Sequence, residues 1–154
     1  MQAKGSRSFR QWYLTVLCLA GCAGGPAILD EADWTFEPLP GGARLTAVDA
    51  AGPVLQMSCN NADGIVVVRA FRLNPITGDL PLVFGTADQA MAFTVDRAAA
   101  GPGVVASRDG AYTLLISLLS EGAVSAVYGE QTVGPVILPG NEADAFAGAC
   151  IEPV

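Results

Sequence analysis

The sequence contains no histidine. This absence excludes Ser-His-Asp and Cys-His catalysis, acid–base catalysis by imidazole, and zinc or haem sites with histidine ligands. The single lysine, Lys4, lies near the N-terminus, so the rest of the chain lacks the amine that a Ser-Lys dyad or a Schiff base requires. There is also no Walker loop and no Gly-x-Gly-x-x-Gly motif. We therefore predict a protein that is not an enzyme and holds no cofactor or metal ion.

Charge is scarce, at 15% of residues, and it is unevenly placed. Lys4, Arg7 and Arg10 are the only charged residues before Asp30, and all 15 acidic residues lie from Asp30 onward. Removal of these three positive charges from a net charge of −7 leaves about −10. Such a domain repels nucleic-acid phosphates and anionic lipid head groups, and no basic patch offsets this repulsion. We expect no nucleic-acid partner.

The N-terminal residues form a secretory leader. Residues 1–10 are polar and cationic, and residues 11–21 form an apolar run that is too short to span about 30 Å of hydrocarbon. Leu19-Ala20-Gly21-Cys22 resembles the lipobox of bacterial lipoproteins. The resemblance implies that the Cys22 thiol receives a diacylglyceryl group and that the leader is removed before Cys22. The alternative is an ordinary secretory leader, cut after Ala20 or Ala23.

This reading divides the chain into a signal peptide over 1–21, a lipidated tether over 22–33 and one β-rich domain over 34–154. Two or three acyl chains, at about 0.8 kcal/mol per buried methylene, hold a protein persistently on a membrane. Ala23 is not the aspartate that resembles an inner-membrane retention signal. The resemblance therefore implies the periplasmic face of the outer membrane.

The four cysteines divide between the leader and the mature chain. Cys18 leaves with the leader, and Cys22 carries the lipid. Cys59 and Cys150 then remain in a compartment that oxidises thiols, so we predict a disulfide between them. Two buried free thiols, or one reactive thiol, are the alternative.

Short apolar runs broken by Gly, Pro, Asn and Asp predict a mainly β domain, either a small sandwich or barrel-like, with α+β as the alternative. The alternation of Leu55, Met57 and Cys59 predicts a strand with Cys59 facing inward. The apolar patterns predict strands over 55–59, 65–72, 82–84, 91–95, 104–106, 124–128 and 132–138.

One or two short helices are expected near the C-terminus. Segment 111–119 fits a helical face and strand alternation nearly equally, and its leucines together with Gly122 favour a helix. Asn141, followed by Asp144, predicts a capped helical turn that delivers Cys150 to the core.

The layout also resembles a known family. Trp34, the Leu-x-Met-x-Cys strand at 55–59, the hairpin after it and a late helix-hairpin-helix ending in Cys150 resemble small exported proteins of the invasion-associated locus B type. The resemblance covers about the last 110 residues in layout only. The chain departs from it in having one candidate disulfide and no lysine beyond the leader. It implies a β-rich exported domain.

Several residues permit rival chemistry. Asp30, Glu31 and Asp33 form a run beside the tether, which we interpret as solvated charge, and Asp88, Asp96 and Asp109 fall in turns or at strand ends. Asn60, Asn61 and Asp63 could bind calcium, although their pattern is more typical of a plain turn. Trp34 and Phe36 could form a binding face, but core packing is the favoured interpretation.

The sequence thus favours a lipid-anchored envelope protein that acts through protein contacts or has a structural role. Its charge favours a basic partner, for example a cationic lytic enzyme such as lysozyme. One alternative is a module that binds a small apolar molecule in a dry cavity of the sheet. The other is a hydrolase with two facing carboxylates about 5–10 Å apart.

Overall fold

A computed structural model describes residues 32–110, 115 and 122–151. The predicted leader, Cys22 and the two acidic residues Asp30 and Glu31 lie outside this part of the chain. So does the ambiguous segment 111–119, apart from Leu115, whose side chain is buried in the core.

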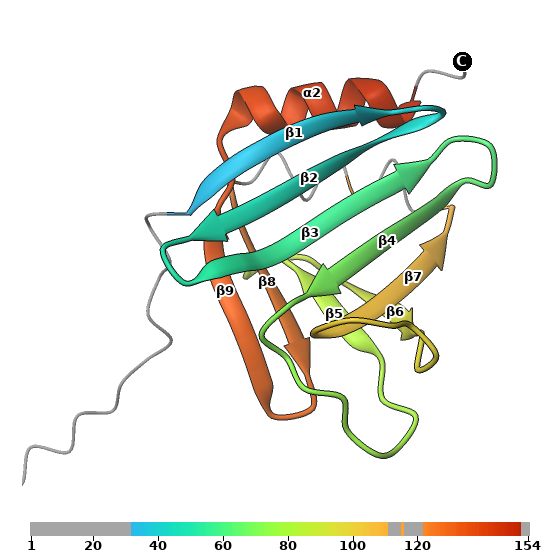
Figure 1. The fold of residues 1–154 in the computed structure, drawn as a ribbon, viewed down its shortest axis with the longest axis vertical. Helices are drawn as coiled ribbons and strands as arrows, with labels where there is room; N and C mark the ends of the chain where they lie inside the picture. The colour runs from blue at the N-terminus through green and yellow to red at the C-terminus, as the bar shows by residue number, and fades with distance from the viewer. Residues whose placement is uncertain (1–31, 111–114, 116–121, 152–154) are drawn as a thin grey trace, which may run out of the picture.

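The described residues form nine strands and one C-terminal helix (Figure 1). The strands are β1 Asp33–Leu39, β2 Gly42–Asp49, β3 Gly52–Asn60, β4 Ile65–Ala70, β5 Leu82–Gly85, β6 Ala90–Val95, β7 Val104–Asp109, β8 Ala123–Tyr128 and β9 Gln131–Ile137. The helix, α2, spans Gly140–Ile151.

All nine strands belong to one antiparallel sheet, in the order β1-β2-β3-β4-β7-β6-β5-β8-β9. Strands β1 to β4 form successive hairpins, and β8 pairs with β9 in another. The pairing of β6 with β7 is short, because only two residue pairs, Thr94–Ser107 and Val95–Ala106, are in register. The sheet turns a corner there, and β1 and β9 are left as its two edges.

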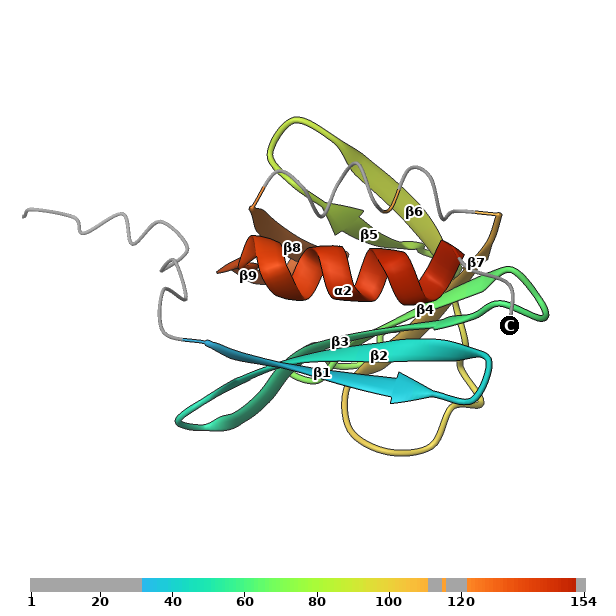
Figure 2. The ribbon, with the colours of Figure 1, turned by 90° about the horizontal axis from the view of Figure 1, so that it is seen from above.

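The sheet curls around the core, with α2 between its two halves (Figure 2). One half contains β1 to β4, and β5, β6, β8 and β9 lie on the other side of the helix. Ala143, Phe146 and Cys150 are the buried residues of α2, and their spacing places them on one helical face. The helix contacts β1 and β2 and so covers the opening that the sheet leaves.

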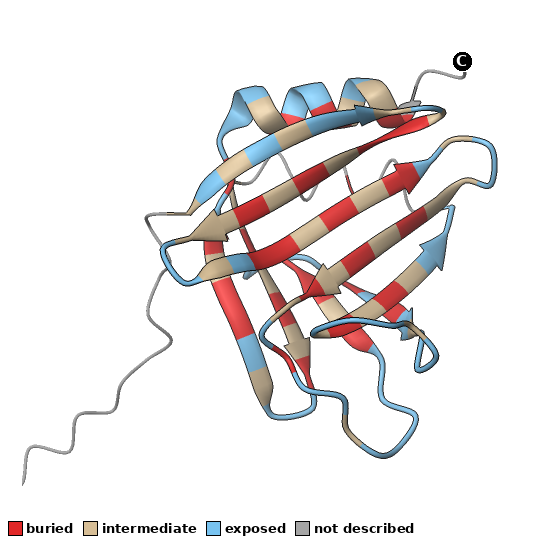
Figure 3. Cartoon of the chain, in the orientation of Figure 1, coloured by how far each residue is buried: buried red, intermediate tan, exposed pale blue. Residues whose placement is uncertain are grey.

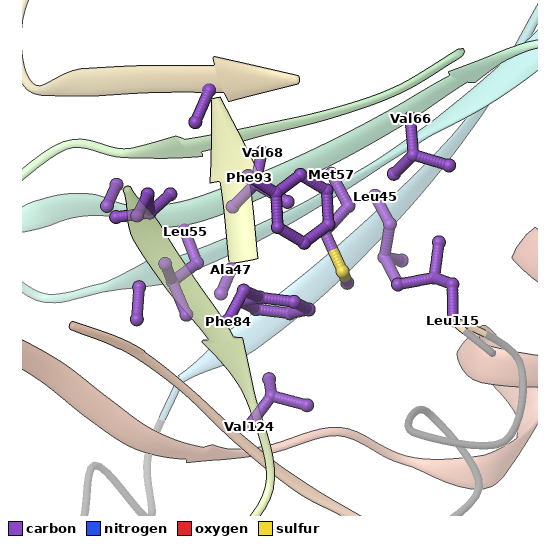
Figure 4. Close-up of a cluster of buried hydrophobic side chains, with 14 of the residues drawn as sticks. Leu45, Ala47, Leu55, Met57, Val66, Val68, Phe84, Phe93, Leu115 and Val124 are labelled. Carbon is purple, nitrogen blue, oxygen red and sulfur yellow. The ribbon is translucent and has the colours of Figure 1, made fainter. Parts of the chain in front are cut away.

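Alternation of buried and exposed residues along each strand separates the core from the outer surface (Figure 3). In β4, for example, Val66, Val68 and Ala70 are buried, whereas Ile65, Val67 and Arg69 are half-buried. Phe84 and Phe93 meet edge to face in the core, with ring centroids 6.2 Å apart (Figure 4). Leucine, valine, methionine and alanine side chains from both halves complete the interior.

The prediction of a mainly β domain with a short C-terminal helix is confirmed. All seven predicted strands are present, and Cys59 points inward as expected. The helix is longer than the predicted turn, and it begins at Gly140, so Asn141 lies within it. The first hairpin, β1–β2, was not among the predicted strands, although the Pro40-Gly41 turn between two alternating segments signals it.

Candidate functional site

The predicted cysteine pair lies at the junction of β3 and α2. Cys59 ends the inward series of β3, and Cys150 is on the buried face of α2, which brings their Cα atoms to 5.8 Å in a disulfide. Beside it, the Asn61 side-chain amide donates a hydrogen bond to the Ala149 carbonyl at 2.9 Å. The prediction of a Cys59–Cys150 disulfide is confirmed, and the bond ties the C-terminal helix to the end of β3.

The Asn60–Gly64 segment is the turn between β3 and β4. The Asn60 amide donates to Asp63 Oδ2 at 2.7 Å, and Asn60 Oδ1 accepts a hydrogen bond from the Ala62 N–H. These bonds use the polar atoms to close an Asx-type turn, as the favoured interpretation of this segment requires. Within the described residues, no group of three or more acidic or cysteine side chains is placed to hold a metal ion.

The candidate catalytic carboxylates that the structure describes lie at the surface. Asp33, at the start of β1, is exposed, as are Asp88, Asp96 and Asp109. Asp96 accepts a hydrogen bond from the Ala98 N–H, which is a turn-capping contact. No polar or charged side chain among the described residues is buried.

Arginine side chains hold turns and loops in place. Glu37 and Arg44 pair across β1 and β2 at 3.1 Å, and Arg97 pairs with Asp79 at 2.6 Å. Arg72 binds Asp49, and this hydrogen bond, with another from the Ala51 N–H, holds the pKa of the Asp49 carboxyl below its usual value. Arg69 and Arg108 donate to the carbonyls of Ala100 and Ala92.

Most of the described acidic residues lie outside these salt bridges. The described acidic residues outside the three salt bridges are Asp33, Asp63, Asp88, Asp96, Asp109, Glu130, Glu142 and Asp144. Asp63 and Asp109 lie at the same end of the sheet, since the Gly110 N–H binds the Gly64 carbonyl at 3.1 Å. The described surface therefore carries more negative than positive charge.

Trp34 and Phe36 pack against the core from β1, as the favoured interpretation predicts. The Trp34 indole N–H also donates to the Ile137 carbonyl at 2.6 Å. This bond joins the two edge strands of the sheet, β1 and β9, over a separation of 103 residues. The sequence carries no local signal for this contact, because it depends on the curl of the whole sheet.

A shallow hollow opens at the start of β5 and the end of β6. It is lined by Asp79, Leu80, Pro81, Thr94, Val95 and Arg97, and its volume is about 170 Å³. Small-molecule sites commonly have volumes of roughly 300–1,000 Å³, so this hollow suits a few waters or a small fragment. It lies at the surface, whereas the apolar-ligand alternative requires a cavity inside the sheet.

Comparisons of the chain with protein-family models, with curated proteins and with solved structures find no match. Among the described residues, no helix has the length and apolar character needed to cross a membrane.

Proposed function

We propose that the chain is a lipid-anchored protein of the bacterial cell envelope that acts by binding another protein. The observation that supports this most directly is the buried disulfide between Cys59 and Cys150. Structural disulfides form in oxidising compartments such as the periplasm, where an exported lipoprotein would reside. The bond uses Cys59 and Cys150, so that Cys22 in the Leu19-Ala20-Gly21-Cys22 motif is left for the lipid.

The acidic surface supports a binding role and favours a basic protein as the partner. The described arginines contact carboxylates or backbone carbonyls, while several exposed carboxylates have no arginine opposite them. A basic protein would be attracted to such a surface, and salt would weaken the attraction because the charges are exposed to solvent.

The anchor is tested by intact-mass analysis of the membrane fraction, with and without reductant. We expect a mass that corresponds to a chain starting at Cys22 with acyl groups attached, and a gain of about two daltons on reduction of one disulfide. Cys22→Ser is the matched variant and should release the protein from the membrane. If Cys22→Ser stays in the membrane fraction as firmly as the unaltered protein, the anchor proposal is wrong.

The binding role is tested with lysozyme as a cationic probe. We expect binding at 20 mM salt that weakens at least tenfold at 300 mM, and that weakens in the double variant Asp63→Asn/Asp109→Asn. Asp144→Asn/Glu142→Gln, on α2, removes the same number of charges at another place and serves as the control. Absence of binding at low salt would remove the basic-partner part of the proposal.

A further inference from the structure

Four neighbouring strands contain no charged residue. Strands β5, β6, β8 and β9 include no Asp, Glu, Lys or Arg at any position. Of the remaining strands only β3 is also uncharged, since β1, β2, β4 and β7 contribute Asp33, Glu37, Arg44, Asp49, Arg69, Arg108 and Asp109. In a chain with a net charge of −7, a charge-free section of this size is a distinct surface feature.

The outer side chains of these four strands form one continuous surface, which we name the uncharged face. Val83 lies beside Ala92 on one side and Val127 on the other, and Val127 lies beside Thr132. Pro135 and Ile137 extend the surface along β9. Ala92, Thr132 and Ile137 are exposed, whereas Val83, Val127 and Pro135 are half-buried. The surface is therefore made of small and branched side chains that water reaches.

The large apolar side chains that are most exposed lie along the same hairpin. Within the described residues, Leu80 and Ile137 have exposed fractions of 47% and 44%. Ile137 is at the open end of the β8–β9 hairpin, where it pairs with Ala123. Leu80 is near the other end, beside Gly129 in the turn. The Asp79–Arg97 ion pair lies beside Leu80, so the uncharged surface ends there and Ile137 is its exposed large apolar residue. An apolar side chain exposed on an uncharged surface indicates contact with a partner of low polarity.

The chain from the predicted lipid site enters the domain at the edge of this face. β1 begins at Asp33, and the next residue, Trp34, binds the Ile137 carbonyl on β9 at 2.6 Å. Asp33 is eleven residues after Cys22, a distance of at most roughly 40 Å if the chain were fully extended. An anchor at Cys22 would thus attach the domain at a point beside the Ile137 edge of the uncharged face, within roughly 40 Å of the lipid.

We propose that the uncharged face lies on the surface of the lipid bilayer when the protein is anchored; this rests on the proposed lipid anchor at Cys22. Anionic head groups repel carboxylates, so the charged half of the sheet turns away from the membrane. The outer surfaces of the two halves point in opposite directions (Figure 2), so contact through one leaves the other open to the periplasm. The acidic surface then remains available to a protein partner.

Two threonines provide a matched test. Thr132 is exposed on β9 within the uncharged face, and Thr35 is exposed on β1, where its neighbours Trp34 and Phe36 pack inward and direct it to the opposite surface. Thr35 is also closer to the tether in sequence. Each is replaced by cysteine, Thr132→Cys or Thr35→Cys, and labelled with a fluorophore in the full mature protein. The labelled proteins are placed in vesicles of phosphatidylethanolamine and phosphatidylglycerol at 3:1, which contain a nitroxide lipid as quencher.

We expect quenching at residue 132 to be at least threefold stronger than at residue 35. Addition of a negative charge in the face by Val127→Glu should remove this difference, whereas Thr46→Glu on the outer side of β2 should preserve it. Circular dichroism establishes that each variant is folded.

Equal quenching at the two sites, or stronger quenching at residue 35, would overturn the proposal. Cross-linking of residue 132 to a second copy, with protection from the lipid quencher, would also overturn it and identify the face as a dimer interface. The intact mass of the same samples separates a missing quenching difference from failure of the anchor. Acylated protein without the quenching difference contradicts the bilayer contact alone, and protein without acyl groups contradicts the anchor.

Discussion

Single charged side chains fasten segments that are distant in the sequence. Arg72 follows β4, and it binds Asp49 at the end of β2. Asp49 also accepts a hydrogen bond from the Ala51 N–H in the turn to β3. One carboxylate therefore holds both a local turn and a neighbouring strand, which is why its pKa lies below the usual value.

This lowered pKa predicts a pH dependence of stability. A carboxyl with a lower pKa in the folded state than in the unfolded state stabilises the fold above the unfolded pKa, near 3.9, and loses that effect as the pH falls through the folded pKa. We expect the free energy of unfolding in urea to fall between pH 6 and pH 3, and to fall less in Asp49→Asn.

Asp88→Asn is the control, since it removes an exposed carboxylate from the β5–β6 turn. An equal reduction of the pH dependence in Asp88→Asn would assign the effect to net charge and not to the contact with Arg72.

At the scale of elements, α2 and the first hairpin respond in opposite ways to an added methyl group. Gly148 lies within α2, is exposed, and has open space where a side chain would point. Gly42 begins β2, and a methyl group there would overlap the Cys59 carbonyl of β3. An added methyl group at residue 148 therefore only restricts the unfolded chain. At residue 42 the same group forces β2 and β3 apart.

We expect Gly148→Ala to raise the free energy of unfolding by about 0.5–1 kcal/mol, since alanine is the better helix former. We expect Gly42→Ala to lower it by about 1–3 kcal/mol, as overpacking commonly does. Urea unfolding followed by circular dichroism measures both changes. A stabilising Gly42→Ala would contradict the close approach of β2 and β3.

At the scale of the whole molecule, two long-range links close the curled sheet. The disulfide joins β3 to α2 across 91 residues of sequence, and the Trp34–Ile137 hydrogen bond joins the edge strands. Because α2 lies between the two halves of the sheet, the disulfide and the hydrogen bond both stabilise the arrangement around the opening that α2 covers.

Loss of the disulfide should therefore be costly. In the chain-entropy model a loop of this length contributes about 4–5 kcal/mol to the free energy of unfolding. We expect a loss of that size on addition of reductant and in Cys59→Ala/Cys150→Ala, measured by urea unfolding. The double variant should be insensitive to reductant. An unchanged unfolding midpoint in reductant would show that the link contributes little.

Much of the fold could be predicted from the sequence because its signals are local. Alternation of Leu55, Met57 and Cys59 predicts a strand, and the polar residues after it predict the turn into the next strand. The disulfide followed from counting cysteines, because Cys59 and Cys150 remain once Cys18 in the leader and Cys22 at the lipid site are set aside. Its partners are 91 residues apart, but Cys59 and Cys150 were the only pair left by that reasoning.

Three features of the surface were not predicted. These are the salt bridges, the contact of Trp34 with Ile137 and the uncharged face. Glu37 and Arg44 would have been found as a cross-strand pair if the Pro40-Gly41 turn had been recognised. The uncharged face needed more than recognition of its strands, because β5 pairs with β8 across a gap of 37 residues.

The sequence by itself determined the β character of the domain, the β3–β4 and β8–β9 hairpins, the inward direction of Cys59 and the pairing of Cys59 with Cys150. Only the tertiary structure decided that β7 lies between β4 and β6, that α2 covers the opening of the sheet, and that the four uncharged strands β5, β6, β8 and β9 lie side by side. The physical reason is range. A strand or a turn depends on the few residues that form it, whereas strand order depends on how all the apolar faces are buried together.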